Sequence, residues 1–257
     1  MNGICDRITI ITGGAKGIGK GISQRMAAEG ATLILVDVDR AALDETVSQL
    51  RDSGATAEAY VADLCQVAEI DALMESVHRR YGRIDILINN AGVQIRQWAT
   101  EFDEAQFDFL MNLNLKAYYF ASRAAARYMQ KQANGGVIVC TSSANSERFT
   151  SRRSPYNISK AAVNGLVGTL SVEWGRFGIR INAVAPGYVL TDMVKQGIEE
   201  GIIDMETNYK VIPMKRLLSL EEVAAGVCFL ASSESSGITG QTLFVDAGWS
   251  RAGLPED

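Results

Sequence analysis

A glycine-rich segment near the start of the chain has the composition of a phosphate-binding loop. Its sequence is Thr12-Gly-Gly-Ala-Lys-Gly-Ile-Gly19, and it lies between a short apolar segment and a helical pattern. Glycines allow the backbone to turn tightly and to approach a pyrophosphate, whose negative charge is favoured at a helix N-terminus. We therefore predict a dinucleotide-binding site at this loop. Its contacts are expected from Gly13, Lys16, Gly17, Ile18 and Gly19.

A magnesium-dependent P-loop is an alternative interpretation of the same glycines. Gly14 and Gly19-Lys20 have the P-loop spacing, but Gly21 occupies the position where a Ser or Thr has to ligate magnesium. The P-loop interpretation therefore fails, and a strand-to-helix turn around a dinucleotide is the better explanation of the glycines.

A carboxylate at the end of the second apolar segment indicates which dinucleotide binds. Asp37 lies 18 residues beyond Gly19. A carboxylate there accepts hydrogen bonds from both ribose hydroxyls and repels a 2′-phosphate, so NAD is favoured and NADP is the less favoured cofactor. Lys16 and Arg40 are cations close by in the sequence that would soften this preference. Asp37 could instead cap the next helix, but Asp39 is better placed to do so.

The composition excludes several other classes of protein. The 257 residues include one His, His78, expected on a helix surface, and four Cys separated by 60, 75 and 88 residues, so no metal site or disulfide framework is predicted. The formal net charge of −5 argues against a nucleic-acid partner. No apolar run is long enough to cross a bilayer, and the N-terminus lacks the order of a signal peptide. We therefore expect a cytoplasmic protein that acts on a small molecule.

Short β-branched segments alternate with helical patterns along the whole chain. The predicted strands are Ile8–Ile11, Thr32–Val36, Ala57–Val61, Ile84–Ile88, Val137–Cys140, Ile179–Ala185 and Thr242–Val245. The predicted helices are Ile18–Glu29, Arg40–Ser53, Val67–Tyr81, Asp103–Gln132, Pro155–Phe177 and Leu220–Ser232. This order predicts an α/β fold: a single doubly wound Rossmann-type domain over residues 1–257, with a seven-stranded parallel sheet and helices on both faces. Residues 191–216 lack strand character and are expected to form a mobile, partly helical excursion at the substrate mouth.

Six motifs give the chain a resemblance to a known family. They are the glycine loop, Asn89-Asn-Ala-Gly92, Asn114, Ser143, Tyr156-Asn-Ile-Ser-Lys160 and Pro186-Gly187. In this order and spacing they resemble the short-chain dehydrogenase/reductase family over essentially the whole chain. One departure is Asp246-Ala247-Gly248, where the family more often has Asp-Gly-Gly, and it concerns a terminal turn rather than the chemistry.

The resemblance implies a catalytic set of Asn114, Ser143, Tyr156 and Lys160. Tyr156 would transfer the proton, and Lys160, four residues later on the same helical face, would lower the pKa of the phenol and reach the nicotinamide ribose. Ser143 would polarise the carbonyl or carbinol oxygen. Asn114 would sit in a helix kink and hold a water that relays protons to Lys160. The family's reaction is the interconversion of a secondary alcohol and a ketone by hydride transfer.

Further cofactor contacts follow from the matching motifs. Asp63 and Leu64 would contact the adenine, and Asn90, Ala91 and Gly92 would line the cofactor after the fourth strand. Beyond Pro186 and Gly187, Val189 and Thr191 would hydrogen-bond the carboxamide. Cys140, by contrast, lies within an apolar strand and is expected in the core.

Three polar loops are expected to surround the substrate. They are Val93–Trp98, Ala144–Pro155 and Tyr188–Arg216, and the candidate substrate residues in them are Gln94, Arg96, Asn145, Arg148, Arg153 and Tyr188. Arginines bind carboxylates bidentately, so a hydroxylated or carboxylated substrate is favoured. The sequences of the segments from Ala91 to Gln97 and from Ala185 to Met193 resemble those of the gluconate 5-dehydrogenase branch of polyol and sugar-acid oxidoreductases. The arginines could instead be solvated or lie at a subunit contact.

Two other functions remain open at this point, as does the oligomeric state. The enzymatic alternative is a 3-oxoacyl-(acyl-carrier-protein) reductase, a type that usually favours NADPH. The alternative of a different class is a catalytically silent dinucleotide sensor, although none of the catalytic residues is lost. By analogy with relatives, we expect a homotetramer or homodimer built from the two longest helices. Their small residues are Ala121, Ala124, Ala125, Ala126, Ala161, Ala162, Gly165 and Gly168.

Overall fold

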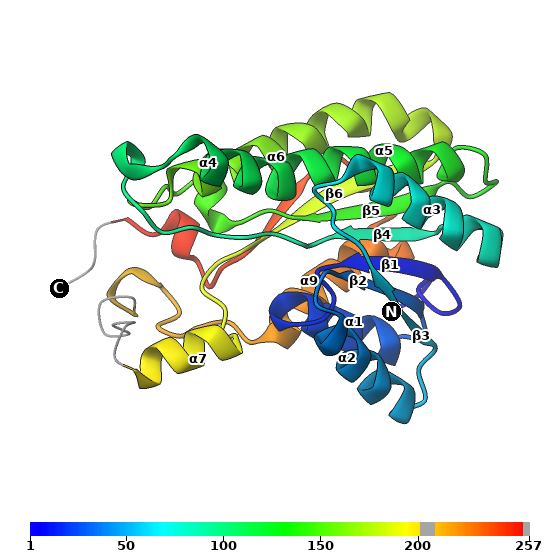
Figure 1. Cartoon of the computed structure of the whole chain (residues 1–257), viewed down its shortest axis with the longest axis horizontal. Coiled ribbons are helices and arrows are strands. Elements are labelled where there is room, and N and C mark those ends of the chain that lie inside the picture. Colours follow the sequence, from blue (N-terminus) through cyan, green and yellow to red (C-terminus); the bar gives the residue numbers. More distant parts are fainter. Residues whose placement is uncertain (201–208, 254–257) are drawn as a thin grey trace.

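The seven strands form one parallel sheet, as predicted. The computed structural model describes residues 1–200 and 209–253. Its strands are β1 (Ile8–Thr12), β2 (Thr32–Asp37), β3 (Ala57–Val61), β4 (Ile86–Asn89), β5 (Gly136–Thr141), β6 (Ile179–Pro186) and β7 (Thr242–Val245). Their order across the sheet is β3-β2-β1-β4-β5-β6-β7, and every neighbouring pair is parallel (Figure 1).

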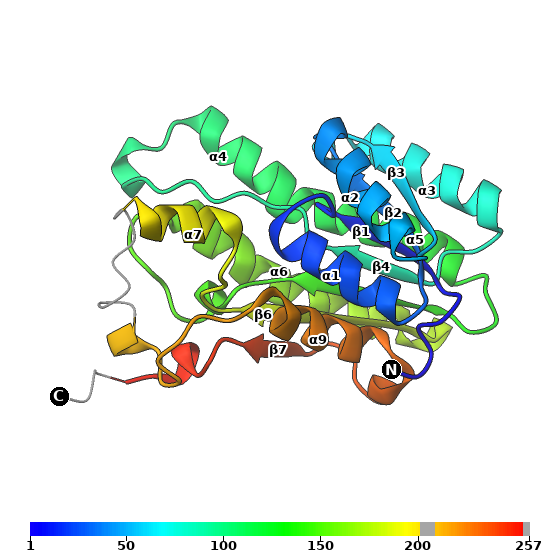
Figure 2. The ribbon, with the colours of Figure 1, turned by 90° about the horizontal axis from the view of Figure 1, so that it is seen from below.

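Helices cover both faces of the sheet, which gives the predicted three-layer architecture. One face carries α1 (Gly17–Ala28), α2 (Arg40–Asp52) and α9 (Leu220–Ala231); the other carries α3 (Val67–Tyr81), α5 (Ala117–Met129) and α6 (Ser154–Trp174) (Figures 1 and 2). Successive residues of a strand point to opposite faces, so Ile10 packs in the core under α3 and α5 while Ile11 packs in the core under α1 and α9. Burial on both faces explains the continuous apolar runs of the strands.

The order of the strands reverses between β1 and β4, and this places the glycine loop beside the end of β4. From β1 the chain runs outward through β2 and β3, then crosses back to β4 on the other side of β1. Ligands of open α/β sheets bind at the carboxyl ends of the strands where the order reverses. The segments that follow β1 and β4 are the glycine loop and Asn90-Ala91-Gly92.

The predicted helix Asp103–Gln132 is wrong as a single element, because a π-helical turn divides it. α4 spans Glu104–Met111, the π-helical turn spans Asn112–Lys116, and α5 follows it. This turn is the kink expected at Asn114. A π-turn contains one extra residue, which redirects the side chains within it, and such turns occur often at functional sites.

The remaining boundaries differ from the prediction by a few residues. β4 begins at Ile86 rather than Ile84, because the backbone N–H of Ile84 donates to the side-chain oxygen of Gln132 at 2.9 Å instead of to a strand. α6 ends at Trp174 and continues as a 3₁₀ turn, Gly175–Phe177. The other 3₁₀ turns are Ala99–Glu101, Ala144–Ser146, Ser233–Ser235 and Trp249–Arg251.

The excursion after β6 is helical in its first part. α7 spans Asp192–Glu199, and Thr191 caps it by accepting from the N–H of Val194 at 3.3 Å. Residues 201–208, which belong to the same predicted excursion, lie outside the described residues. Val189 and Leu218, which flank the excursion, pair in an isolated parallel bridge and so bring its two ends together.

Candidate active site

The glycine loop after β1 is packed so closely that two of its glycines leave no room for a side chain. A Cβ added to Gly13 would lie 2.8 Å from the Cα of Ala91, and one added to Gly19 would lie 1.8 Å from the carbonyl oxygen of Gly13. Gly13 also has a φ of +62°, in the left-handed region that favours glycine. The loop therefore has the tight turn and close approach expected of a pyrophosphate-binding segment.

Two side chains at the ends of β1 and β4 hold this loop in place. The Thr12 hydroxyl accepts from the backbone N–H groups of Asn90 and Ala91 at 2.9 and 3.1 Å. The Asn90 amide donates to the carbonyls of Thr12 and Gly13, both at 3.1 Å. Asn90, predicted to line the cofactor, thus also orders the glycine loop. Thr12 was missed as a site residue, because its role arises only when β1 and β4 lie side by side.

The first turn of α1 fits a dinucleotide's phosphates. Its N-cap, Lys16, makes no side-chain capping hydrogen bond, and the first turn contains no acidic residue. The backbone N–H groups of this first turn, from Gly17 onward, therefore have no side-chain acceptor that would compete with a phosphate. The helix dipole also favours an anion at this end. Gly17, Ile18 and Gly19 of the prediction all belong to this turn. The residues present fit the cofactor that the sequence predicts.

The carboxylate expected to select the cofactor lies at the end of β2. Asp37 is half-buried and accepts the N–H of Asp39 at 3.2 Å. Asp39, and not Asp37, caps α2 by accepting from the N–H of Ala42 at 3.1 Å, as predicted. Both nearby cations have carboxylate partners: Lys16 pairs with Asp39 at 2.7 Å, and Arg40 pairs with Asp44 at 2.8 Å. The counterions reduce the positive charge that would soften the preference set by Asp37.

The residues predicted near the adenine are held within their own loop. Asp63 accepts from the N–H of Cys65 at 2.9 Å, and its own N–H donates to Glu69 at 2.8 Å. Leu64 is buried, and its side chain packs in the core between the sheet and α3. A contact from Leu64 to a cofactor would therefore use its backbone rather than its side chain.

Ser143, Tyr156 and Lys160 are brought together between β5 and α6. Ser143 follows β5 and caps the turn Ala144–Ser146, with its hydroxyl accepting from the N–H of Asn145 at 3.1 Å. Tyr156 and Lys160 lie one turn apart on α6, and a hydrogen bond joins Ser143 to Tyr156. Lys160 is only 3% exposed, and its Nζ lies 5.8 Å from the centre of the Tyr156 ring. The predicted catalytic grouping is therefore present in space.

The pKa values in this group differ from the sequence-based expectation. Burial raises the pKa of Tyr156, while the hydrogen bond from Ser143 and the charge of Arg153 act in the opposite direction. Burial also lowers the pKa of Lys160 to about 8. The expected lowering of the phenol's pKa by Lys160 is not seen, because the ammonium donates to the Thr141 carbonyl at 2.7 Å and desolvation of the phenolate is the larger effect.

Asn114 connects the π-helical turn to the segment after β4. Its amide accepts from the N–H of Val93 at 2.8 Å and donates to the Val93 carbonyl at 2.9 Å and to the Ser159 hydroxyl at 3.2 Å. A Cβ on Gly92 would lie 3.1 Å from Oδ1 of Asn114 and 3.6 Å from Nζ of Lys160. Asn114, Gly92 and Lys160 therefore converge, with glycine providing the space between them.

The segment after β6 reaches back to the glycine loop. A Cβ on Gly187 would lie 2.8 Å from the Cα of Asp246, so glycine is needed where the chain leaves β6 after Pro186. Thr191 then lies opposite Gly17: the methyl carbon of Thr191 is 3.9 Å from where a Cβ of Gly17 would be. Val189 is buried, whereas Thr191 is half-buried. Two segments predicted to bind opposite parts of the cofactor, the glycine loop and the segment after β6, thus lie close together.

Three of the six candidate substrate residues are fixed in contacts of their own. Asn145 is buried and donates to Thr150 at 3.0 Å and to Asn157 at 3.2 Å. Arg148 donates to carbonyls of the C-terminal turn, and the Tyr188 ring packs against Trp249 at 5.2 Å. These contacts give the three residues structural roles, which the sequence of the loops did not indicate.

The other three candidates have no such partners. Gln94 and Arg96 are exposed and Arg153 is half-buried. Within the described residues, none of these three side chains makes a hydrogen bond or ion pair. Arg153 is also the candidate whose charge acts on Tyr156. It lies three residues before Tyr156, at the N-cap of α6.

Three residues outside the catalytic group were also singled out in the sequence: His78, Cys140 and Ala247. His78 is not simply solvated, since its ring stacks on Tyr128 with centroids 4.4 Å apart. Cys140 is fully buried in the core, as predicted. Ala247, at the departure from the family pattern, has a φ of +54°, where glycine would be unstrained.

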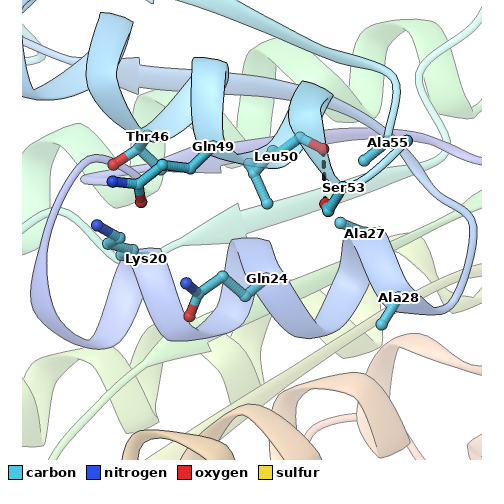
Figure 3. Close-up of a pocket in the computed structure, with 10 residues that line it drawn as sticks. Lys20, Gln24, Ala27, Ala28, Thr46, Gln49, Leu50, Ser53 and Ala55 are labelled. Atoms are coloured by element: carbon cyan, nitrogen blue, oxygen red, sulfur yellow. Dashed lines mark hydrogen bonds between the residues drawn. The ribbon is translucent and has the colours of Figure 1, made fainter.

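Neither a metal centre nor a membrane helix is found among residues 1–200 and 209–253. No group of three or more His, Cys, Asp or Glu side chains there could hold a metal ion. None of the helices described is both long and apolar enough to span a bilayer. A groove of mixed polar and apolar lining lies between α1 and α2, with Lys20, Gln24 and Leu50 among its residues, but it contains none of the predicted site residues (Figure 3).

Comparisons with known proteins agree with this geometry. A family model described as Enoyl-(Acyl carrier protein) reductase matches residues 13–250. The 3-oxoacyl-(acyl-carrier-protein) reductase FabG of Thermotoga maritima is 37% identical over 242 residues, covering 94% of this chain and 97% of the relative. The levodione reductase of Leifsonia aquatica is 36% identical over 257 residues, covering 96% and 95%. A crystal structure of a gluconate 5-dehydrogenase from Burkholderia cenocepacia J2315 in complex with NADP and tartrate has a TM-score of 0.91 and 32% identity, covering 98% of this chain and 97% of that chain.

The fold and the site together define a nicotinamide-dinucleotide-dependent oxidoreductase. The chain belongs to the short-chain dehydrogenase/reductase family. Its activity is therefore the interconversion of an alcohol and a ketone with NAD or NADP as cofactor. The nicotinamide, when bound, accepts or donates the hydride.

Proposed function

We propose that this enzyme oxidises a secondary alcohol of a polyol, sugar or sugar acid, with an acid as the best substrate. The observation that carries this proposal is Arg153, a half-buried guanidinium without a hydrogen-bond or ion-pair partner in the described part of the chain, three residues before Tyr156. Guanidinium presents several donors in a planar fork that matches a carboxylate. A substrate carboxylate would supply the partner that the protein does not.

The proton transfer is assigned to Tyr156. In oxidation, phenolate would take the hydroxyl proton of the substrate, and Ser143 would hold the same oxygen by a hydrogen bond. The buried ammonium of Lys160 and the amide of Asn114 would continue the proton path from Tyr156 towards the protein interior. This assignment is supported by the position of Ser143 and Lys160 at the end of β5, by Tyr156 one turn before Lys160 on α6, and by the absence of any His other than His78 from the sequence.

The preferred cofactor is proposed to be NAD. Asp37 ends β2, where it would meet the adenine ribose and disfavour a 2′-phosphate. The Burkholderia cenocepacia relative is described in complex with NADP, so the cofactor preference of this enzyme has to be measured. The paired charges of Lys16 and Arg40 support the NAD assignment, since neither cation is left without a carboxylate.

The substrate proposal is tested with two molecules that differ in one group. D-gluconate carries a carboxylate where D-glucitol carries CH₂OH, and both are assayed with NAD by absorbance at 340 nm. We expect the wild-type enzyme to prefer gluconate. Arg153→Gln should lower kcat/KM for gluconate about 30- to 100-fold more than for glucitol, because charge-assisted hydrogen bonds to the carboxylate are lost. A loss common to both substrates would reflect the charge of Arg153 on Tyr156.

The matched control is Arg152→Gln, which removes the neighbouring arginine, whose guanidinium lies over the Trp98 ring. This change should leave the preference for the acid intact. If the wild-type enzyme shows no preference for gluconate, the sugar-acid proposal is wrong. If that preference exists but survives Arg153→Gln, the proposal stands and only the role of Arg153 is wrong.

A second candidate function is reduction of a 3-oxoacyl thioester. Two aromatic side chains at the loops around the site, Trp98 and Phe149, are 52% and 68% exposed, and they would suit a substrate with an apolar chain. The Thermotoga maritima relative carries the name of such an enzyme. Oxidation of NADH or NADPH by the acetoacetyl thioester of N-acetylcysteamine, faster than any sugar-acid oxidation, would favour this function instead.

The enzyme is further proposed to be a homodimer or homotetramer joined through α5 and α6. An apolar hollow lies on the outer side of these two helices, lined by Leu115, Lys116, Tyr119, Phe120, Ala162, Gly165, Leu166, Thr169 and Leu170. Tyr119 is 45% exposed there. An identical helix pair from a second copy would cover the hollow, since small residues permit close approach of helices.

A further inference from the structure

The loop that joins Ser143 to Tyr156 is held by hydrogen bonds at Asn145, Thr150 and Arg152, the last of which accepts from the N–H of Gln97 at 2.9 Å. At the base, Asn145 donates to Thr150 and to Asn157, which ties the loop to α6. The next residues, from 147 to 153, are mostly exposed. This half of the loop also carries Phe149, and a loop with so little burial is not held by packing alone.

Arg148 supplies a link from this loop to the C-terminal turn Trp249–Arg251. Its Nη1 donates to the carbonyl of Trp249 and, at 3.0 Å, to the carbonyl of Ala252. The same guanidinium lies over the Trp249 ring, 5.1 Å from its centre. One side chain thus makes hydrogen bonds and a cation–π contact with a segment 101 residues away in the sequence.

Trp249 in turn contacts the segment after β6. Its side chain is 3% exposed, and its ring meets the ring of Tyr188 edge-on at 5.2 Å and 74°. Tyr188 in turn precedes Val189, the first of the residues expected at the carboxamide. A salt bridge between Arg251 and Glu147 at 3.1 Å runs parallel to the Arg148 contact but is exposed, so it contributes little.

We infer that Arg148 is a positioning residue: it clamps the loop between Ser143 and Tyr156 to the C-terminal turn, and through Trp249 it sets the position of Tyr188 at the substrate pocket. The inference rests on the alcohol–ketone chemistry of the family and holds for an acid, a polyol or a thioester. It assigns Arg148 a role different from the substrate contact that its position in the loop suggested.

The clamp joins two of the loops expected to surround the substrate, and its contacts do not include the glycine loop. Its loss should therefore weaken substrate binding more than cofactor binding, which the glycine loop also supports. Lysine cannot replace arginine fully, because a single ammonium has no planar fork and stacks less well on an indole. The expected order of substrate affinity is wild type, then Arg148→Lys, then Arg148→Met.

The kinetic test compares Arg148→Met with Arg152→Met, the neighbouring arginine that has no hydrogen bond to the C-terminal turn. Assays use D-gluconate with NAD and the acetoacetyl thioester with NADH, so that either class of substrate gives a signal. We expect Arg148→Met to raise KM for the substrate about 10- to 30-fold, with kcat within about 3-fold and KM for the cofactor within about 2-fold. Arg152→Met should change each value by less than about 3-fold.

A second measurement does not depend on any substrate. Chymotrypsin cleaves after Phe149 once the loop detaches, and we expect cleavage of Arg148→Met to be at least about 5-fold faster than that of Arg152→Met. In Trp249→Ala, which removes the partner ring but keeps the two backbone carbonyls that accept from Arg148, adding Arg148→Met should increase KM by a smaller factor than it does in the wild type. Independent, additive effects would overturn the inference, as would an unchanged cleavage rate or a parallel loss of kcat and cofactor affinity.

Discussion

The ammonium of Lys160 donates to the carbonyl oxygen of Thr141 at 2.7 Å, at the end of β5. Within residues 1–200 and 209–253, no carboxylate pairs with it, although its side chain is almost completely buried. It also lies 5.1 Å from the centre of the Tyr118 ring, so its contacts are a carbonyl and aromatic faces. Such a site orients an ammonium without stabilising its charge fully, and the pKa of Lys160 falls to about 8.

This relationship predicts that Lys160 destabilises the fold at neutral pH. The folded-state pKa of about 8 is below the ordinary value of 10.5, so the unfolded chain holds the proton more tightly. Replacing Lys160 by Met should therefore raise the free energy of unfolding at pH 7 by about 1–3 kcal/mol, even though activity is lost. The penalty is complete below pH 8 and declines as the pH rises towards 10.5.

Urea unfolding at pH 7 and at pH 10 measures this difference. The advantage of Lys160→Met over the wild type should shrink at the higher pH. A variant that is less stable than the wild type at pH 7 would show that the hydrogen bond to Thr141 outweighs the desolvation of the ammonium.

Tyr156→Phe tests the proton-transferring group. The change removes only the phenolic oxygen, so the fold and the affinity for NAD should survive while turnover drops by roughly 10²- to 10⁴-fold. Burial raises the pKa of Tyr156, so oxidation by the wild type should increase with pH into the alkaline range, because phenolate is the active form. Steady-state kinetics and NAD titration measure both effects. Near-normal turnover with NAD still bound would contradict the assignment.

Asp37→Ser tests the choice of cofactor. Removing a negative charge next to the expected 2′-phosphate position should relax discrimination against NADP by about 10-fold or more, since such a repulsion is worth on the order of 1–3 kcal/mol. The ratio of kcat/KM with NAD to kcat/KM with NADP is the measurement. Asp39→Ser is the control, because that carboxylate caps α2 and pairs with Lys16. A wild-type enzyme that already prefers NADP would refute the role of Asp37.

Gly165→Arg tests the proposed subunit contact. Nothing lies within 4 Å of a Cβ at Gly165, so the single chain has room for a side chain, whereas a second copy on the apolar hollow would collide with it. We expect light scattering to show monomers for this variant and dimers or tetramers for the wild type. Gly175→Arg serves as the control, because Gly175 has equal room but lies outside the hollow. A wild-type protein that is monomeric at all concentrations would end this proposal.

The order of elements and the glycine loop were predictable because their signals are local. β2 and β3 begin at the predicted residues, Thr32 and Ala57, and α3 has the predicted ends at Val67 and Tyr81. Asp39 was identified as the cap of α2 because capping depends on residues only three positions apart. The kink at Asn114 was implied by the family resemblance, whereas the periodicity alone predicted one continuous helix.

The contacts of the catalytic and substrate residues were decided by the tertiary structure. Thr12 reaches Asn90 across 78 residues, Lys160 reaches Thr141 across 19, and Arg148 reaches Trp249 across 101. Sequence spacing shows which types of residue are available at a strand end or in a loop, but not which partner meets them there. Among the polar residues of one loop, only long-range packing distinguished Arg148, whose donors are used, from Arg153, which has no partner in the described part of the chain. Desolvation depends on the same packing. Burial therefore raises the pKa of Tyr156, whereas the spacing of Tyr156 to Lys160 predicted a lowered pKa.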